Sequence, residues 1–265
     1  DVIIHLAAQP LVRDSYKYPI ETFETNVIGT LNILEATRDL ESLKATLIIT
    51  TDKVYKNKNN QRAYIETDEL GGSDPYSASK AAADIATQSW VRSFSNSSVS
   101  IARAGNVIGG GDWAKDRIIP DLVKAYSNFQ IPKLRFPEAI RPWQHVLDCL
   151  NGYLKLVDKQ IFNGFSGEWN FGPNLIEKYS VGDLVTAFAN RWGIEGPLWN
   201  VDNSNQPHEA EYLVLNSEKS NELLNWSNKL DFLNTINWTA DFYKNVEKLS
   251  IRQLCLNQIN EFFEI

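Results

Sequence analysis

Short apolar runs alternate with segments of helical periodicity through the first hundred residues, and no other feature constrains the fold as strongly. The apolar runs lie at 2–7, 45–51 and 99–104, and the helical patterns lie at 20–38 and 76–94. Apolar runs of this length are typical of parallel strands that are buried on both faces. Because parallel strands are joined by crossover helices, we predict an α/β fold with a doubly wound parallel sheet and helices on both faces.

The pattern changes after Gly109-Gly110-Gly111, beyond which helical periodicity predominates. A further strand is expected at 168–172, and an extended piece is expected near 131–136. Helices are expected at 117–128, 145–158, 180–192 and 217–224, and twice within 231–262. We therefore expect a second, smaller and helix-rich domain in addition to the sheet.

The composition is that of an ordinary globular chain, and it excludes several classes of function. The 265 residues carry a net charge of −7 with no polybasic run, so we expect no nucleic-acid partner. No stretch of about 18 apolar residues occurs, so we expect no membrane span. Cys149 and Cys255 show no metal-ligand spacing and are predicted to be two buried free thiols in a reducing compartment, which indicates the cytoplasm and no metal.

Tyr76 and Lys80 stand four residues apart in the sequence Tyr-Ser-Ala-Ser-Lys, at the start of a predicted helix. On a helix this spacing puts the phenol and the ammonium on one face, one turn apart. A nearby cation favours the phenolate and makes Tyr a usable base near neutral pH. A redox enzyme needs such a base to take a proton from a sugar hydroxyl, although a solvated helix face would use the same residue types.

Polar clusters follow each of the three predicted strands. Small residues and an amide follow the first strand at 7–9, a hydroxyl, a carboxyl and an amine follow the second at 50–55, and a Gly-rich turn follows the third at 109–112. Each cluster alone could be a packing or turn feature. Because ligands of open α/β sheets bind at the carboxyl ends of the strands, three clusters at the same end favour a catalytic site.

The sequence around these clusters resembles the extended short-chain dehydrogenase/reductase family and, within it, the CDP-glucose 4,6-dehydratases. Lys53 follows Asp52, where the related dTDP-glucose and GDP-mannose dehydratases carry Asp-Glu. The resemblance runs from the first residue to about Tyr243. The matching strings are His5–Gln9, Ala8–Arg13, Thr50–Tyr55, Asp74–Lys80, Arg103–Trp113, Ile140–Val146, Trp169–Pro173 and Pro207–Ala210.

This resemblance implies a role for each residue of the catalytic cluster. Tyr76 would deprotonate the sugar 4-hydroxyl, and Lys80 would tune Tyr76 and bind the nicotinamide ribose. Thr51 would hydrogen-bond the 4-hydroxyl. Lys53 would help to remove the C5 proton, and Asp52 would protonate the departing 6-hydroxyl. Since a base must be a free amine, we expect Lys53 to lie in a largely closed pocket.

The resemblance also implies NAD as the cofactor and CDP-glucose as the substrate. Ala7, Ala8 and Gln9 would line the cofactor cleft together with Tyr76 and Lys80. The residues expected to face the nucleotide sugar are Asn106, Trp113, Arg117, Arg141 and His208. Relatives often pair through the helix that carries Tyr76, so a homodimer is expected.

The family's Gly-rich phosphate-binding fingerprint does not occur in these 265 residues. We expect it to lie upstream of Asp1, so that the sheet lacks its N-terminal units and this stretch alone is inactive. The predicted domains are a partial NAD-binding Rossmann domain at 1–107 and 140–172, and a nucleotide-sugar-binding domain at 108–139 and 173–265. A 4-epimerase, a dehydratase for another nucleotide sugar and a non-catalytic binding protein remain alternatives.

Overall fold

The computed structural model describes residues 1–58, 61–94, 98–174, 178–204 and 211–265. The chain forms two compact units. Unit 1 comprises 1–105, 150–172 and 213–227, and unit 2 comprises 106–149, 173–212 and 228–265.

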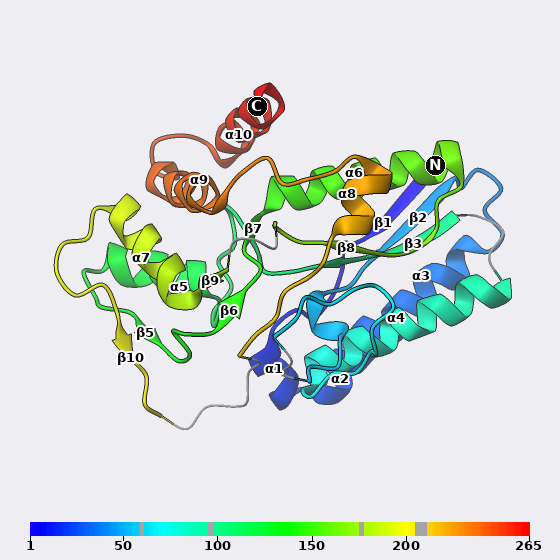
Figure 1. Cartoon of the computed structure of the whole chain (residues 1–265), viewed down its shortest axis with the longest axis horizontal. Coiled ribbons are helices and arrows are strands. Elements are labelled where there is room, and N and C mark those ends of the chain that lie inside the picture. Colours follow the sequence, from blue (N-terminus) through cyan, green and yellow to red (C-terminus); the bar gives the residue numbers. More distant parts are fainter. Residues whose placement is uncertain (59–60, 95–97, 175–177, 205–210) are drawn as a thin grey trace. The chain divides into compact units, whose positions relative to one another are not determined.

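A four-stranded parallel sheet forms the centre of unit 1 (Figure 1). Its strand order is β1-β2-β3-β8. The strands are β1 (Val2–His5), β2 (Ala45–Ile49), β3 (Ser98–Ala104) and β8 (Gly167–Phe171). The predicted α/β fold with a parallel sheet is therefore confirmed, and all four strands lie at predicted positions.

Helices cover both faces of this sheet (Figure 1). On one face, α3 (Gly29–Thr37) and α4 (Pro75–Phe94) bury Leu34 against Ile48 and Val99. On the other face, α6 (Val146–Asn163) packs Tyr153 edge-on against Phe171 of β8. Because apolar contacts cover both faces, β2 is a nearly continuous apolar run, whereas β3 and β8 also carry polar residues.

The segment before β2 is a chain of short helices, whereas a single helix was predicted over 20–38. The order is α1 (Val12–Lys17), α2 (Pro19–Phe23), a π-helical turn η1 (Glu24–Ile28) and then α3. Pro19 starts a new helix because it lacks an N–H and suits a first helical position. The π-helical turn carries the buried Asn26, and such turns occur frequently at functional sites.

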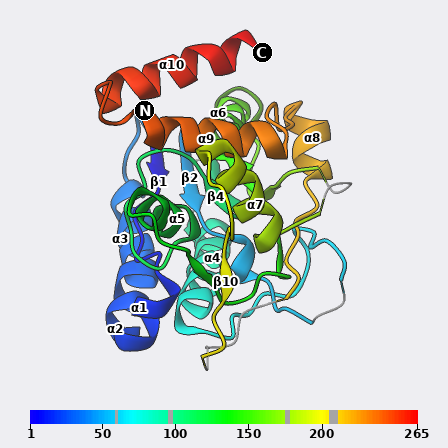
Figure 2. The ribbon, with the colours of Figure 1, turned by 90° about the vertical axis from the view of Figure 1, so that its left-hand side faces the viewer.

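Unit 2 is built on three amphipathic helices that share one apolar core. They are α5 (Ile118–Ser127), α7 (Val181–Trp192) and α9 (Phe232–Asn245), of which α7 and α9 pack together (Figure 2). Ser180 and Asp183 form a capping box that starts α7, and Gly193 ends it in the left-handed conformation. The short strands of unit 2 are β4 (Val107–Ile108), β5 (Lys133–Leu134), β6 (Ile140–Arg141), β7 (Gln144–His145), β9 (Tyr179–Ser180) and β10 (Asn200–Val201).

Two further helices, α8 (Glu218–Leu224) in unit 1 and α10 (Ile251–Glu264) in unit 2, lie at predicted positions. The prediction that both cysteines are buried is wrong for one of them. Cys149 is buried, but Cys255 lies on an exposed face of α10. Among the described residues, none of the helices is both long and apolar enough to span a membrane.

Candidate active site at the strand ends of unit 1

The start of α4, which carries Tyr76, is held by hydrogen bonds from two directions. The Asp74 carboxylate accepts from the Ser77 N–H at 2.9 Å and from the Ser77 hydroxyl at 2.5 Å. The Tyr76 N–H donates to the buried Ser15 hydroxyl at 3.1 Å. Gly72 approaches this turn so closely that a Cβ there would lie 2.2 Å from the Ala78 nitrogen. The first turn of α4 is therefore fixed by its neighbours.

Lys80 is buried one turn further along α4, with 6% of its surface exposed. Its Nζ donates to the Ile49 carbonyl at 2.7 Å, which places the amine at the carboxyl end of β2. Burial lowers the pKa of Lys80 to about 8, against the opposing effect of the Asp84 carboxylate. Lys80 thus joins the helix to the strand end where the second polar cluster begins.

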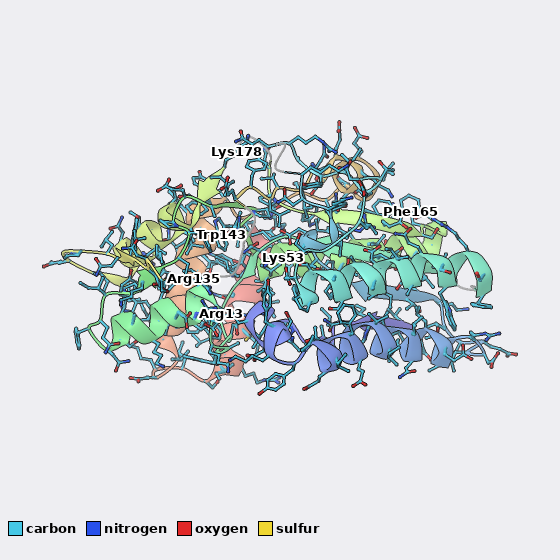
Figure 3. All side chains as sticks on the ribbon, turned by 90° about the horizontal axis from the view of Figure 1, so that it is seen from below. Arg13, Lys53, Arg135, Trp143, Phe165 and Lys178 are labelled. Carbon is cyan, nitrogen blue, oxygen red and sulfur yellow. The ribbon has the colours of Figure 1, made fainter. Side chains whose placement is uncertain are left out.

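That polar cluster forms a short 3-10 helix, η2 (Asp52–Val54), which packs against α4. Asp52 is buried, and its Oδ1 accepts from the Thr51 hydroxyl at 3.0 Å. Lys53 lies near the amino-terminal end of α4 (Figure 3). The structure therefore brings the elements that carry all five predicted catalytic residues together at one end of the sheet.

The expected enclosure of Lys53 is not observed, because its side chain is only half-buried. The residue is the second of a three-residue helical turn, and the buried neighbours Asp52 and Val54 take the inward positions. The described residues therefore leave part of this side chain exposed.

The loop after β1 carries the three residues predicted to line the cofactor cleft. Ala7 is exposed and Ala8 is half-buried. The Gln9 side chain is engaged within the protein, since its amide donates to Thr22 Oγ1 at 2.8 Å and its Oε1 accepts from the Leu11 N–H at 2.6 Å. Gln9 therefore braces the loop, whereas Ala7 leaves the backbone accessible.

Asn26 is a site residue that the sequence did not reveal. Its Oδ1 accepts from the Gln9 N–H at 2.8 Å, and its Nδ2 donates to Ser79 Oγ at 2.9 Å. Ser79 in turn donates to the Tyr76 carbonyl at 2.7 Å. Asn26 thus connects the loop after β1 to the first turn of α4, and a polar residue within an apolar helical pattern was the only available signal.

In unit 2, three predicted substrate residues lie around the Gly-rich turn. Asn106 accepts from the Gln144 N–H through its backbone carbonyl. Arg117 pairs with Asp112 at 3.4 Å, with both side chains more than a third exposed. Trp113 is 58% exposed and contacts the ring of Tyr243 edge-on at 5.1 Å.

Packing explains the small residues of the Gly-rich turn without a phosphate ligand. A Cβ on Gly110 would lie 2.0 Å from the Phe242 ring, and one on Gly109 would lie 2.6 Å from the Val146 side chain. A tight, closely packed turn is therefore enough to explain why this segment is rich in glycine.

Arg141 is buried on β6 and lines a pocket within unit 2. Its Nη1 donates to the Ile140 carbonyl, and the pocket wall includes Trp143 and the stacked rings of Tyr179 and Phe232. A guanidinium beside aromatic rings suits an anionic ligand with a planar group. His208, the remaining predicted substrate residue, lies outside the described residues.

His145 is buried in unit 2 and packs edge-on against Trp238. Its Nδ1 accepts from the Leu147 N–H at 3.3 Å, and burial lowers the pKa of the imidazole to about 4. Because the unfolded chain binds this proton near pH 6.5, stability contributed by the neutral imidazole is complete above that pH and is lost as pH falls toward 4.

Replacing His145 by Asn is therefore expected to weaken the acid sensitivity of folding. Between about pH 7 and pH 4.5, the unmodified protein should lose about 2–3 kcal/mol more unfolding free energy than the His145→Asn variant. Urea unfolding at both pH values measures this difference. Equal losses in the two proteins would contradict the assignment of His145 as an acid-sensitive group.

Comparison with known proteins identifies the family. The model of the NAD dependent epimerase/dehydratase family matches residues 1–172. The chain belongs to this family. It is 41% identical over 254 residues to CDP-glucose 4,6-dehydratase of Salmonella typhimurium, covering 92% of this chain and 70% of that relative.

More distant relatives and solved structures also match this chain. The chain is 32% identical over 162 residues to dTDP-glucose 4,6-dehydratase of Mycobacterium tuberculosis, spanning less than half (48%) of that relative's length. UDP-glucuronic acid 4-epimerase of Bacillus cereus superimposes with a TM-score of 0.82 at 22% identity, over 93% of this chain and 76% of that structure. The dTDP-glucose 4,6-dehydratase of Bacillus anthracis, solved in complex with NAD, gives 0.77 at 23% identity, over 93% and 73%. These structures share the Rossmann-like fold predicted from the sequence.

Proposed function

We propose that this protein converts CDP-glucose to CDP-4-keto-6-deoxyglucose by NAD-dependent 4,6-dehydration. The observation that carries this proposal is the Thr51-Asp52-Lys53 sequence at the carboxyl end of β2, beside the helix with Tyr76 and Lys80. An acid and an amine together suit the removal of water across a C–C bond, which epimerisation does not require. The 41% identity to a CDP-glucose enzyme supports the choice of nucleotide.

The residues at this end of the sheet fit NAD. The exposed Ala7 has no bulky side chain over the backbone, and the buried Lys80 amine provides a hydrogen-bond donor at the strand end. Ala7, Ala8, Gln9, Tyr76 and Lys80 would line or hold the cofactor. When bound, NAD supplies a carbon that accepts a hydride and later returns it.

The side chains of unit 1 account for each proton transfer in the proposed reaction. Tyr76 removes the proton of the sugar 4-hydroxyl. The Thr51 hydroxyl, which can rotate away from Asp52, donates a hydrogen bond to the 4-oxygen. The 4-keto group then acidifies the C5 proton, which Lys53 removes. Asp52 gives a proton to the departing 6-hydroxyl, which leaves as water, and the protonated Lys53 amine returns its proton to C5 when C6 is reduced.

Binding of the nucleotide part is assigned to unit 2. Arg141 is the strongest candidate for a phosphate contact because it is a buried guanidinium on the wall of a pocket. Asn106, Arg117, Trp113 and His208 stay weaker predictions, and Arg117 would have to exchange its contact with Asp112. The division of the two units into cofactor-binding and sugar-binding domains also stays a prediction.

A panel of nucleotide sugars tests the proposed substrate. The natural protein is incubated with NAD and CDP-glucose, dTDP-glucose or UDP-glucose, and the absorbance of the 4-keto sugar in base is measured. We expect product from CDP-glucose alone. Product from another nucleotide sugar, or a C4 epimer without water loss, would assign one of the alternative reactions instead.

A homodimer is proposed through the exposed face of α4. Residues Ala78, Ala82, Ile85 and Ser89 recur at helical spacing along this face, and Ile85 is 52% exposed. Ile28 on the adjacent η1 turn is also exposed. Small side chains allow close approach of a second helix, and exposed apolar groups favour its burial.

The variant Ile85→Glu is expected to weaken this dimer at least about tenfold, because a buried charge would face its symmetry mate. Sedimentation equilibrium measures the dissociation constant. Leu40→Glu, at another exposed apolar position of unit 1, is the matched control and should leave association unchanged. A monomeric natural protein, or an equal effect of both variants, would rule out this interface.

A further inference from the structure

Asp84 lies on α4 one turn beyond Lys80, and both of its carboxylate oxygens are fully occupied. Oδ2 accepts from Arg103 Nε at 2.8 Å and from the Thr50 hydroxyl at 3.1 Å. Oδ1 accepts from Arg103 Nη2 at 2.8 Å and from Gln88 Nε2 at 2.9 Å. Four donors on two oxygens use the usual acceptor capacity of a carboxylate.

This arrangement occupies the carboxylate that lies one turn from Lys80 on the same helix. A Lys and an Asp at i and i+4 on one helix face would ordinarily form an ion pair. Within the described part of the chain, the Lys80 amine donates to no carboxylate, and its hydrogen bond goes to the Ile49 carbonyl. Lys80 stands one helical turn from both Tyr76 and Asp84, so movement of its amine toward one of them is movement away from the other.

Arg103 cannot easily be displaced from Asp84, because the rest of its guanidinium is also bound. Nη1 donates to the Tyr55 hydroxyl at 3.0 Å and to the Glu66 carbonyl at 2.8 Å. Both Arg103 and Asp84 have fully buried side chains. The pair is therefore a fixed element beneath the catalytic turn of α4.

We propose that Arg103 is a positioning residue for the proposed dehydration: by holding Asp84, it keeps the Lys80 amine at the carboxyl end of β2 and available to Tyr76. This inference rests on the proposed function for its catalytic consequence. Its structural part, the choice of partner by Lys80, can be measured without substrate.

Removing Arg103 frees two acceptor sites on Asp84, and the buried ammonium of Lys80 is then attracted to them. The pKa of Lys80, lowered to about 8 by burial, should rise because a carboxylate would stabilise its charged form. The same variant with Asp84→Asn has no carboxylate to offer, so the rise should disappear. The charged or titratable groups around Lys80 include His5, Asp52, Lys53, Tyr76, Asp84 and Arg103. The helical segments that contact α4 add Arg13, Asp14, Tyr16, Lys17, Glu21, Glu24 and Glu35.

The test is titration of Lys80 in the natural protein by NMR of labelled lysine side chains, with the signal assigned through Lys80→Arg. We expect Arg103→Met to raise the titration midpoint by about one pH unit or more, and Arg103→Met combined with Asp84→Asn to restore it. An unchanged midpoint in Arg103→Met overturns the proposal. An equal displacement in the single and double variants also overturns it, because a general loss of packing would produce that result.

A milder pair of substitutions covers the case in which Arg103→Met does not fold. Thr50→Val combined with Gln88→Leu frees one acceptor site on each oxygen while Arg103 stays in place. A smaller upward shift is expected there, and no shift would count against the proposal.

The acid limb of the kcat profile for CDP-glucose reports protonation of the base, Tyr76. When Lys80 turns to Asp84, the phenolate loses its nearby cation, so this limb should move upward together with the Lys80 midpoint in each variant. A limb that stays in place while Lys80 shifts would contradict the catalytic part. Absence of turnover in the unmodified protein would instead contradict the proposed substrate and leave the titration result standing.

Discussion

The variant Tyr76→Phe should lower kcat for CDP-glucose about 10³-fold, because it removes the group proposed to take the 4-hydroxyl proton. The change deletes one oxygen from a half-buried side chain, and the hydrogen bonds described above at the start of α4 use the backbone of Tyr76 and neighbouring side chains. Folding should therefore be preserved. Product formation and the unfolding free energy are measured side by side.

Tyr18→Phe is the matched control, since Tyr18 is 58% exposed and lies between α1 and α2. It should leave kcat unchanged. A loss smaller than about tenfold in Tyr76→Phe would mean that the phenol is not the base, and it would favour the reading of the chain as a binding protein.

The variant Asp52→Asn should separate water loss from the earlier proton transfers. We expect product formation to fall about 10²–10³-fold, because an amide cannot protonate the departing 6-hydroxyl. Tyr76 and Lys53 remain, so the C5 proton of the bound sugar should still exchange with solvent. Recovery of CDP-glucose from heavy water and measurement of deuterium at C5 by NMR tests this expectation.

Asp39→Asn, in an exposed turn of unit 1, is the control for the loss of one carboxylate. It should change neither product formation nor exchange. Loss of C5 exchange in Asp52→Asn to the level of Tyr76→Phe would contradict the assignment, since it would place Asp52 in the first proton transfer instead of the last.

The main elements of the fold could be predicted because their signals are local. The run 45–51 predicted β2, and the helical pattern from 76 to 94 predicted α4, whose observed bounds are Pro75–Phe94. The broken helix over 12–37 was not predicted, because its π-helical turn carries Asn26, which is hydrogen-bonded to Gln9 and Ser79, and no local signal indicates those distant contacts. The exposure of Cys255 likewise depends on which face of α10 finds a partner.

Part of the candidate site could likewise be predicted from the sequence, and part of it could not. Thr51 and Asp52 follow β2 directly, so the strand pattern already placed them at the carboxyl end of a strand. Lys80 reaches the same strand end from α4 through its hydrogen bond to Ile49. The contacts of Asp84 with Thr50 and Arg103 join α4 to two different strands, so no spacing in the sequence indicated them. The half-buried Lys53 contradicts an expectation drawn from chemistry alone, since the need for a free amine does not determine how the chain packs.

In the proposed reaction, one sugar is oxidised at C4 and reduced at C6 within a single turnover at the strand ends of unit 1. The most direct test uses CDP-glucose labelled with deuterium at C4, incubated with the natural protein and NAD. We predict that the label leaves C4 and is found at C6 of the 4-keto-6-deoxy product. Label retained at C4, or absent from C6 of a product that has lost water, would contradict the claim.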